Sequence, residues 1–303
     1  MKTAWGDISV NDAHVHFFSH RFFSMLAAQK PGLTFAGIGE ILGWEMPPED
    51  PGELAERWVL ELDKHGLERA VLMASLPGDE ASVHAAIKAF PNRFYGYFFA
   101  NPLAPDGIER VEQSLAAGLR GVCLFPAMHR YSLHDERVAP VFKLAEQTPG
   151  SVVFVHCGVL SVGVRGKLGL SSPFDLRYSN PIDLHHIALR HPQANFVVPH
   201  FGAGYFREAL MLCALCPNVY LDTSSSNNWL RFQASRMDLR TAFEKALEVA
   251  GPQRLLFGSD SSFFPRGWHH QIFETQSALL AVIGVNAGDA REIFGGNLAR
   301  LLS

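Results

Sequence analysis

The chain alternates short, continuously apolar segments with longer segments in which apolar residues recur at helical spacing. Eight short segments are typical of buried strands, because they are rich in β-branched and aromatic residues and are bounded by turn residues. They are residues 8–15, 69–75, 94–100, 119–126, 151–156, 195–200, 218–223 and 254–260. Helical patterns follow at residues 53–65, 80–90, 107–117, 137–147, 182–191, 206–216, 239–250 and 271–283, several of them ending at Gly or Pro. Eight such repeats favour an α/β protein with a closed (β/α)₈ TIM barrel over an open doubly wound sheet, which usually has fewer strands.

Length and composition agree with a barrel. The 303 residues suit a single domain over 1–303 with front-face loop insertions, and a hydrophobic fraction of 48% supplies a large core. The net charge of −4 with scattered basic residues predicts no nucleic-acid partner. No apolar run reaches membrane-spanning length and the N-terminus lacks a signal-peptide pattern, so we expect a cytoplasmic protein without a membrane partner. The four cysteines are expected to be reduced, since a chain of this size needs no disulfide framework.

Residues that commonly bind metal ions stand at the ends of several predicted strands. His14 and His16 are two positions apart at the end of the first strand, and side chains at that spacing project from the same face. His156, His200 and Asp260 end the fifth, sixth and eighth strands. Each histidine alone is more often a core residue, but the strand ends of a parallel barrel open onto one face, where the five side chains can meet.

With this order of ligand residues the chain resembles the amidohydrolase superfamily. It is most similar to the branch that includes aminocarboxymuconate-semialdehyde decarboxylase, resorcylate-type decarboxylases and pyrone-dicarboxylate lactonase. The segments that carry the resemblance span nearly the whole chain: Asn-Asp-Ala-His-Val-His at 11–16, Gly-Val-Cys-Leu-Phe-Pro at 121–126, Phe-Val-His-Cys-Gly at 154–158, Val-Pro-His-Phe-Gly at 198–202, Leu-Phe-Gly-Ser-Asp at 256–260 and the closing 293–302.

The resemblance implies one divalent metal ion bound by His14, His16, His156 and Asp260. Three nitrogens and one oxygen with an open position form a catalytic rather than a structural site; zinc fits this set best, with manganese and iron as alternatives. Family members use the carboxylate of the Asp260 type partly as a base for the metal-bound water, and the histidine of the His200 type as an acid/base or carbonyl polariser. We therefore predict His200 and Asp260 as catalytic residues.

One departure from the superfamily bears on the number of metals. Many members place a carbamylated lysine at the end of the fourth strand to bridge two ions, and related members place a glutamate there. Here Cys123 stands where that lysine would fall. Without a bridging carboxylate the sequence favours a mononuclear site.

Two long front-face segments, 17–51 and 159–181, are predicted beside the barrel mouth. The first is strongly aromatic and is predicted to form an apolar lid or a partner surface. The second contains Arg165 and Arg177, which we predict as contacts to a substrate carboxylate because guanidinium binds carboxylate in bidentate fashion. Phe263, three residues after Asp260, is predicted to form a wall of the pocket, with core packing as an equal alternative.

Three functions are compatible with these observations. The first is a metal-dependent hydrolase acting through a metal-bound water on a small, carboxylated lactone, ester or amide. The second is a nonoxidative, metal-dependent decarboxylase of an aromatic or enoic acid, and the third is a non-catalytic ligand-binding barrel. The intact ligand set argues against the third. We favour the hydrolase, with a small-molecule substrate as its partner and a homodimer left open, because attack by metal-bound water needs only the residues named.

Overall fold

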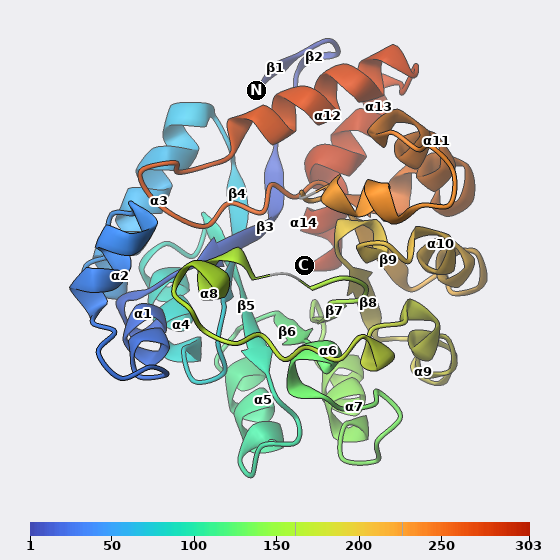
Figure 1. Ribbon diagram of the computed structural model, residues 1–303. Coiled ribbons are helices and arrows are strands. Elements are labelled where there is room, and N and C mark those ends of the chain that lie inside the picture. Colours follow the sequence, from blue (N-terminus) through green and yellow to red (C-terminus); the bar gives the residue numbers. More distant parts are fainter. Residues whose placement is uncertain (161, 226) are drawn as a thin grey trace.

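The structure is a computed structural model that describes residues 1–160, 162–225 and 227–303. Its main sheet has eight parallel strands, which follow one another around the sheet in chain order. They are β3 (Asn11–Phe17), β4 (Arg69–Ala74), β5 (Phe94–Ala100), β6 (Gly121–Leu124), β7 (Val152–Val155), β8 (Asn195–Val198), β9 (Val219–Asp222) and β10 (Leu255–Leu256). Backbone hydrogen bonds join the two edges: Ala13 N donates to Phe257 O at 2.8 Å, and Asp260 N donates to His14 O at 2.9 Å. The predicted (β/α)₈ barrel is confirmed (Figure 1).

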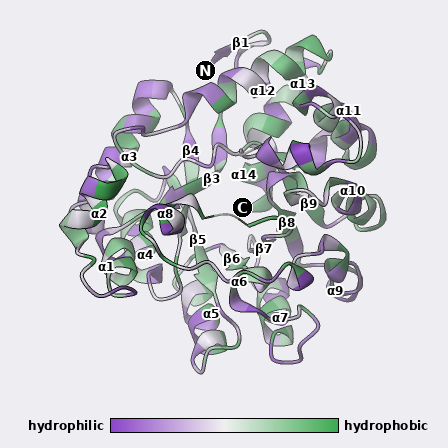
Figure 2. Cartoon of the chain, in the orientation of Figure 1, coloured by the Kyte–Doolittle hydropathy of each residue, from purple (hydrophilic) through white to green (hydrophobic). Residues whose placement is uncertain are grey.

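Helices surround the strands. They are α1 (His20–Ala27), α2 (Phe35–Leu42), α3 (Pro51–His65), α4 (Glu80–Ala89), α5 (Gly107–Ala116), α6 (Pro126–His129), α7 (Ala139–Gln147), α8 (Gly163–Lys167), α9 (Leu184–Arg190), α10 (Phe206–Leu215), α11 (Leu239–Ala250), α12 (His270–Val282), α13 (Ala287–Arg291) and α14 (Asn297–Leu301). A hairpin of β1 (Lys2–Thr3) and β2 (Gly6–Asp7) precedes the barrel. The outer helices carry both hydrophilic and hydrophobic residues, as expected when one face of a helix packs against the sheet (Figure 2). None of the described helices is long and apolar enough to cross a membrane.

Alternating side chains along the strands build two separate packing layers. Tyr97 and Phe99 of β5 join a cluster that also contains Cys123 and Phe154, whereas Phe98 belongs to the large cluster that includes residues of the surrounding helices. Because successive side chains of a strand point to opposite faces, the first cluster is the barrel interior and the second is the layer between barrel and helices. The interior is thus filled with side chains, and a site can form only at its ends.

The observed element bounds differ from the predicted ones mainly at the last strand and in the front segments. The eighth strand covers only residues 255–256 of the predicted 254–260, because the chain then leaves the regular ladder to position Asp260. The first strand begins at residue 11 and continues to 17. The first front segment contains helices α1 and α2, which the sequence pattern did not predict.

The two front segments pack on each other beside the barrel mouth. Leu168 and Leu170 of the second segment belong to a buried apolar cluster with Phe22, Phe23 and Ile38 of the first. The Nζ atom of Lys30 also donates to Leu168 O at 3.0 Å. The segment that carries α8 therefore crosses in front of the strand ends and is anchored on α1 and α2 (Figure 1).

Candidate active site at the carboxyl ends of the strands

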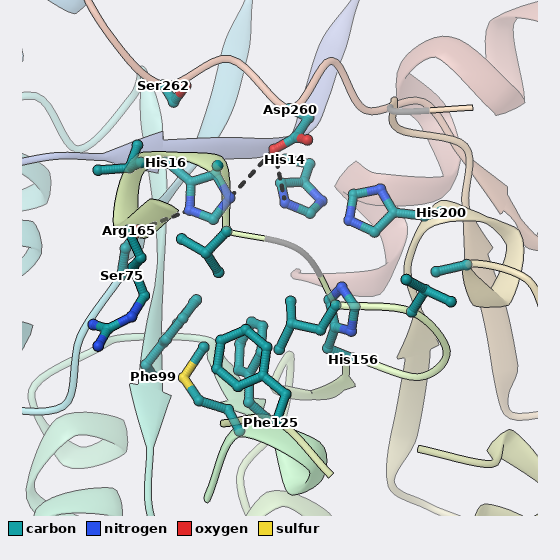
Figure 3. A pocket seen from close by; sticks show the side chains of 18 of the residues that line it. His14, His16, Ser75, Phe99, Phe125, His156, Arg165, His200, Asp260 and Ser262 are labelled. Carbon is teal, nitrogen blue, oxygen red and sulfur yellow. Dashed lines mark hydrogen bonds and ion pairs between the residues drawn. The ribbon is translucent and has the colours of Figure 1, made fainter. Parts of the chain in front are cut away.

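His14, His16 and Asp260 converge at the barrel mouth. One ligand atom from each lies within 4.8 Å of the other two. The Nε2 atoms of His14 and His16 lie 3.6 Å and 3.2 Å from the same oxygen, Oδ1 of Asp260. Figure 3 shows both imidazole rings directed toward this carboxylate. Two nitrogens and one oxygen in this arrangement can bind a divalent cation and leave coordination positions open.

Buried partners fix which nitrogen of each histidine faces the site. The Nδ1 atom of His14 lies 2.6 Å from Oδ2 of Asp222 at the end of β9, and a carboxylate can only accept a hydrogen bond. The Ser75 hydroxyl donates to Met73 O at 3.1 Å and so must accept from Nδ1 of His16, 2.7 Å away. Both histidines therefore carry hydrogen on Nδ1 and direct the lone pair of Nε2 at the site, which is the tautomer a metal ligand needs.

Asp12 holds the backbone of the site together. Its carboxylate accepts hydrogen bonds from His14 N at 2.9 Å, from Ser259 N at 3.0 Å and from the indole Nε1 of Trp268 at 2.7 Å. Burial raises the pKa of Asp12 to about 6, against the opposing effect of these hydrogen bonds. The side chain thus ties the strand that carries the histidines to the loop that carries Asp260.

Close packing behind His14 requires glycine at position 258. A Cβ atom there would lie 2.6 Å from Oδ1 of Asp222, 2.9 Å from Cβ of His14 and 3.0 Å from Cβ of Ser224. Side chains cannot approach so closely without displacement. Gly258 therefore allows β3 and β9 to bring His14 and Asp222 into contact.

Nearby charges keep the Asp260 carboxyl ionised. Burial alone would raise its pKa, but the adjacent imidazole groups of His16, His14 and His200 bring the pKa well below its ordinary value. Conversely, burial alone would lower the pKa of His14, whereas the carboxylate of Asp222, followed by those of Asp260 and Asp12, raises it. The carboxylates and imidazole groups of the site thus shift one another's pKa values, and a bound cation would add a positive charge beside the carboxylate of Asp260.

His200 lies just beyond the end of β8 and beside this cluster. Its ring centroid lies 5.0 Å from that of His14, and its Nδ1 lies 3.2 Å from the carbonyl oxygen of Ser224, which can only accept. The hydrogen is therefore on Nδ1 and the lone pair of Nε2 is available. Burial and the charge of His14 lower the pKa of His200, so the ring is neutral near pH 7.

His156 is close to His200 but lies outside the three-residue cluster. The two ring centroids are 5.4 Å apart, and Phe125 stacks on the other side of His156 at 5.2 Å. Its buried Nδ1 has no hydrogen-bond partner among the described residues, and burial lowers its pKa well below the ordinary value. A buried ring nitrogen without a partner is unfavourable unless a ligand or an ion satisfies it.

Backbone strain is concentrated at these residues. His200 and Asp260 have positive φ angles of 54° and 58°, and Phe201 and Ala203 have 53° and 45°. Such conformations disfavour residues with a Cβ atom and often occur where function requires a particular side-chain direction. Here two of the strained residues are the predicted catalytic pair.

The cluster lies in the wall of a cavity of 540 Å³. All five strand-end residues line it: His14, His16, His156, His200 and Asp260. The volume is in the range of cavities that bind a small organic molecule.

Comparisons with known proteins agree with this arrangement. A model of the amidohydrolase family matches residues 12–303. The chain belongs to the amidohydrolase family. This is the family that the sequence motifs predicted, and membership supports an enzyme of the hydrolase type.

Several solved structures share the fold of this amidohydrolase. An uncharacterized TIM-barrel protein from Bordetella bronchiseptica superposes with a TM-score of 0.66 at 19% identity, over 97% of this chain and 98% of the other. A Burkholderia multivorans amidohydrolase with bound Zn gives 0.64 at 20%, over 97% and 99%. A probable 2-pyrone-4,6-dicarboxylic acid hydrolase from Acinetobacter baumannii with bound citric acid gives 0.61 at 15%, over 97% and 99%.

Sequence similarity to a curated protein is confined to a short segment. The protein fluG of Emericella nidulans is 35% identical to this amidohydrolase over 91 residues, which are 30% of this chain. The match spans only 10% of the length of fluG.

The structure places only one of the three predicted substrate contacts in the cavity wall of the amidohydrolase. Arg165 on α8 lines the cavity. Arg177 does not: its side chain is 80% exposed and pairs with Asp175 at 2.6 Å, because an acidic residue two positions earlier offers a closer partner. Phe263 stacks on Trp44 with centroids 3.9 Å apart, so Trp44 lines the cavity and Phe263 lies behind it.

Three important residues were missed by sequence reasoning. Asp222, Ser224 and Ser75 orient the histidines, yet none was predicted as a functional residue. Asp222 and Ser75 do end or directly follow strands, which is the same positional signal that identified Asp260. Ser224 carried no such signal, because a serine two residues beyond a strand is ordinary loop sequence.

Proposed function

We propose that this amidohydrolase is a metal-dependent hydrolase that acts on a small carboxylated lactone, ester or amide. The single observation that carries the proposal is the convergence of the Nε2 atoms of His14 and His16 on Asp260, with both Nδ1 atoms already occupied. The donor set fits a divalent ion, and zinc suits its two nitrogens and one oxygen. The structurally similar amidohydrolase with bound Zn and the structurally similar protein described as a pyrone-dicarboxylic acid hydrolase support the proposal of a metal-dependent hydrolase.

His156 is the proposed fourth ligand. Its buried Nδ1 lacks a partner among the residues that the structure describes, and its ring faces the same cavity. It does not belong to the group of three ligand atoms within 4.8 Å, so its part in metal binding is tested by the metal content of His156→Ala, which should be lower than that of the wild-type protein.

A divalent ion bound there would polarise a water molecule and lower the pKa of that water toward neutrality. Asp260 remains ionised, so its carboxylate can bind the cation and accept a hydrogen bond from a nucleophilic water. His200 offers the lone pair of Nε2 on the other side of the same cavity and can accept a proton from the attacking water.

The state of His200 favours hydrolysis over decarboxylation. A decarboxylase has to deliver a proton to carbon after carbon dioxide leaves, which requires a protonated acid beside the substrate. His200 carries its hydrogen on Nδ1, directed at Ser224, and burial lowers its pKa, which favours the neutral ring. A neutral imidazole of this tautomer suits a base that assists attack by water.

The test is a substrate screen that follows two products at once. The purified protein would be offered lactones, esters and amides of small carboxylic acids together with hydroxybenzoates, while acid release and carbon dioxide are both recorded. We expect acid release without carbon dioxide, lost on chelation and restored by zinc. Carbon dioxide evolution that depends on the same residues would assign the protein as a decarboxylase instead.

A further inference from the structure

One side of the cavity is apolar and aromatic. Phe99 and Phe125 lie with ring centroids 4.0 Å apart, and Phe125 continues the surface to His156. Phe18 stacks on His16 at 5.4 Å. The aromatic surface therefore begins directly at the histidines of the site (Figure 3). A molecule that reaches these histidines would bury its own apolar body against these rings.

The cavity wall carries more positively charged than negatively charged residues. Among the described residues that line it, Asp260 is the one carboxylate, whereas Arg165, Arg231 and Arg266 are three cations. None of these arginines forms an ion pair within the described part of the chain. The arginine pairs that do form lie elsewhere, as Arg177 with Asp175 illustrates. The cavity is thus suited to an anion.

Arg165 is the best placed of the three. Its Nε and Nη2 atoms donate to Ser171 O at 3.0 Å and 2.7 Å, and its Nη1 donates to Oε1 of Gln29 at 2.7 Å. These acceptors are neutral, and they use three of the five N–H groups of the guanidinium. The side chain is half-buried, so its charge is costly without a compensating anion. Figure 3 shows Arg165 on the side of His16, across the cavity from His156 and His200.

The other two arginines are less suited to hold an anion inside the cavity. Arg231 and Arg266 are exposed residues. The Nη2 atom of Arg266 already donates to Asp260 O at 3.3 Å and to Oγ of Ser262 at 3.1 Å. Arg266 already interacts with Asp260 and Ser262, and solvent screens the charge of Arg231, so each should contribute less than Arg165.

We propose that the cavity binds an amphiphilic monocarboxylate, whose carboxylate pairs with Arg165 while its aromatic or branched apolar body packs against Phe99 and Phe125. This inference rests on the proposed function, because it assigns the substrate class of that site. The remaining N–H groups of Arg165 match the planar geometry of a carboxylate. A short acid such as acetate would fill little of the 540 Å³ cavity and would leave the apolar wall uncovered.

The experiment measures binding, and no turnover is needed. Isothermal titration at pH 7.5 would compare 3-phenylpropionate, its neutral amide and propionate on the wild-type protein. The same series would be run on Arg165→Met and on Arg177→Met. Arg177 is the matched control, because it lies on the same front segment but is paired with Asp175 outside the cavity.

We expect the wild-type protein to bind phenylpropionate about 10 to 100 times more tightly than the amide, because the amide cannot form the charge-assisted pair. We expect a preference of the same size over propionate, because propionate has no ring to bury. Arg165→Met should remove the preference over the amide and keep the preference over propionate, and Arg177→Met should change neither. Equal binding of phenylpropionate and its amide by the wild-type protein would overturn the proposal without need of a variant. An unchanged preference in Arg165→Met would also overturn it.

Failure of this proposal can be told apart from failure of the proposed function. A protein that shows the predicted binding but hydrolyses nothing in the screen would keep the ligand class and lose the hydrolase assignment. A protein that hydrolyses neutral esters as well as carboxylated ones, without the binding preference, would keep the hydrolase and lose the ligand class.

Discussion

The two walls of the candidate active site are built differently. On the wall formed by β3, His14 and His16 each have Nδ1 bound to a buried partner, and both direct Nε2 at Asp260. On the wall formed after β7 and β8, His200 is held by Ser224 but Nδ1 of His156 has no partner among the described residues. The first wall is therefore preorganised for the cation that we propose. On the second wall, Nδ1 of His156 and Nε2 of His200 are available to a substrate or an ion.

The substitution that should damage this arrangement most is Asp260→Asn. The amide keeps the size of the side chain but removes the negative charge on which both histidines converge. It should therefore weaken cation binding and lower kcat by about 10⁴-fold or more, since a ligand and a base are lost together. Steady-state kinetics with saturating zinc would measure the loss. A variant with more than a tenth of wild-type kcat would mean that Asp260 takes no part in the chemistry.

His200→Asn tests the second wall and should have the next largest effect. It should keep the metal while lowering kcat by about 10²–10⁴-fold, the usual contribution of a positioned acid or base. Metal content and turnover would be measured on the same sample. If the metal is lost as readily as in His156→Ala, His200 is a ligand and the division between the two walls is wrong.

Asp222→Asn tests how far the first wall depends on its buried partner. Asparagine can still accept from Nδ1 of His14 but carries no charge, so zinc affinity should fall by about 10–100-fold. Competition with a chelating dye would measure the affinity. Asp238→Asn is the control, because Asp238 caps the distant helix α11. Unchanged affinity in Asp222→Asn would show that the hydrogen bond alone, without the charge, orients His14.

A smaller effect is expected at His129, a histidine outside the cavity wall. Burial lowers its pKa to about 4, and its Nδ1 lacks a partner among the described side chains and backbone. Between the unfolded pKa of about 6.5 and the folded value, the unfolded chain binds a proton that the folded chain does not. The contribution of neutral His129 to the free energy of unfolding is therefore retained above a pH of about 6.5. The free energy of unfolding falls by about 2–3 kcal/mol as the pH is lowered to 4.5.

His129→Leu should remove this part of the acid sensitivity. Urea unfolding at pH 7 and pH 4.5 would measure it, with His134→Leu as the control, since His134 is exposed in the neighbouring loop. The same loss of stability in His129→Leu as in the wild-type protein would assign the acid sensitivity to other groups.

The sequence predicted the fold and the meeting of five strand-end side chains at one cavity, and the reason is physical. Strand ends of a parallel barrel open onto one face, so the spacing of His14 and His16 and the positions of His156, His200 and Asp260 sufficed to place them around one cavity. These residues are fixed by regular elements, whose periodicity can be read directly from the pattern of apolar residues.

Residues on irregular segments could not be predicted in the same way. Arg165 and Arg177 look alike in the sequence, but the local pair with Asp175 holds Arg177 outside the cavity. Phe263 lies behind Trp44, a contact between segments more than 200 positions apart. Asp222 stands at a strand end, a signal the sequence did offer, but its contact with His14 depends on the close approach of β3 and β9 at Gly258, which no local pattern indicates.

The central claim is that the wall of β3 binds a catalytic metal ion, and metal content tests it most directly. Elemental analysis would be made on the purified wild-type protein, His14→Ala, His16→Ala and His200→Asn, each after incubation with zinc and gel filtration. We predict about one zinc per chain in the wild-type protein and in His200→Asn, and almost none in His14→Ala or His16→Ala, because each of these two removes one of three converging ligand atoms. Wild-type zinc content in His14→Ala would contradict the account, and two ions per chain would contradict its mononuclear site.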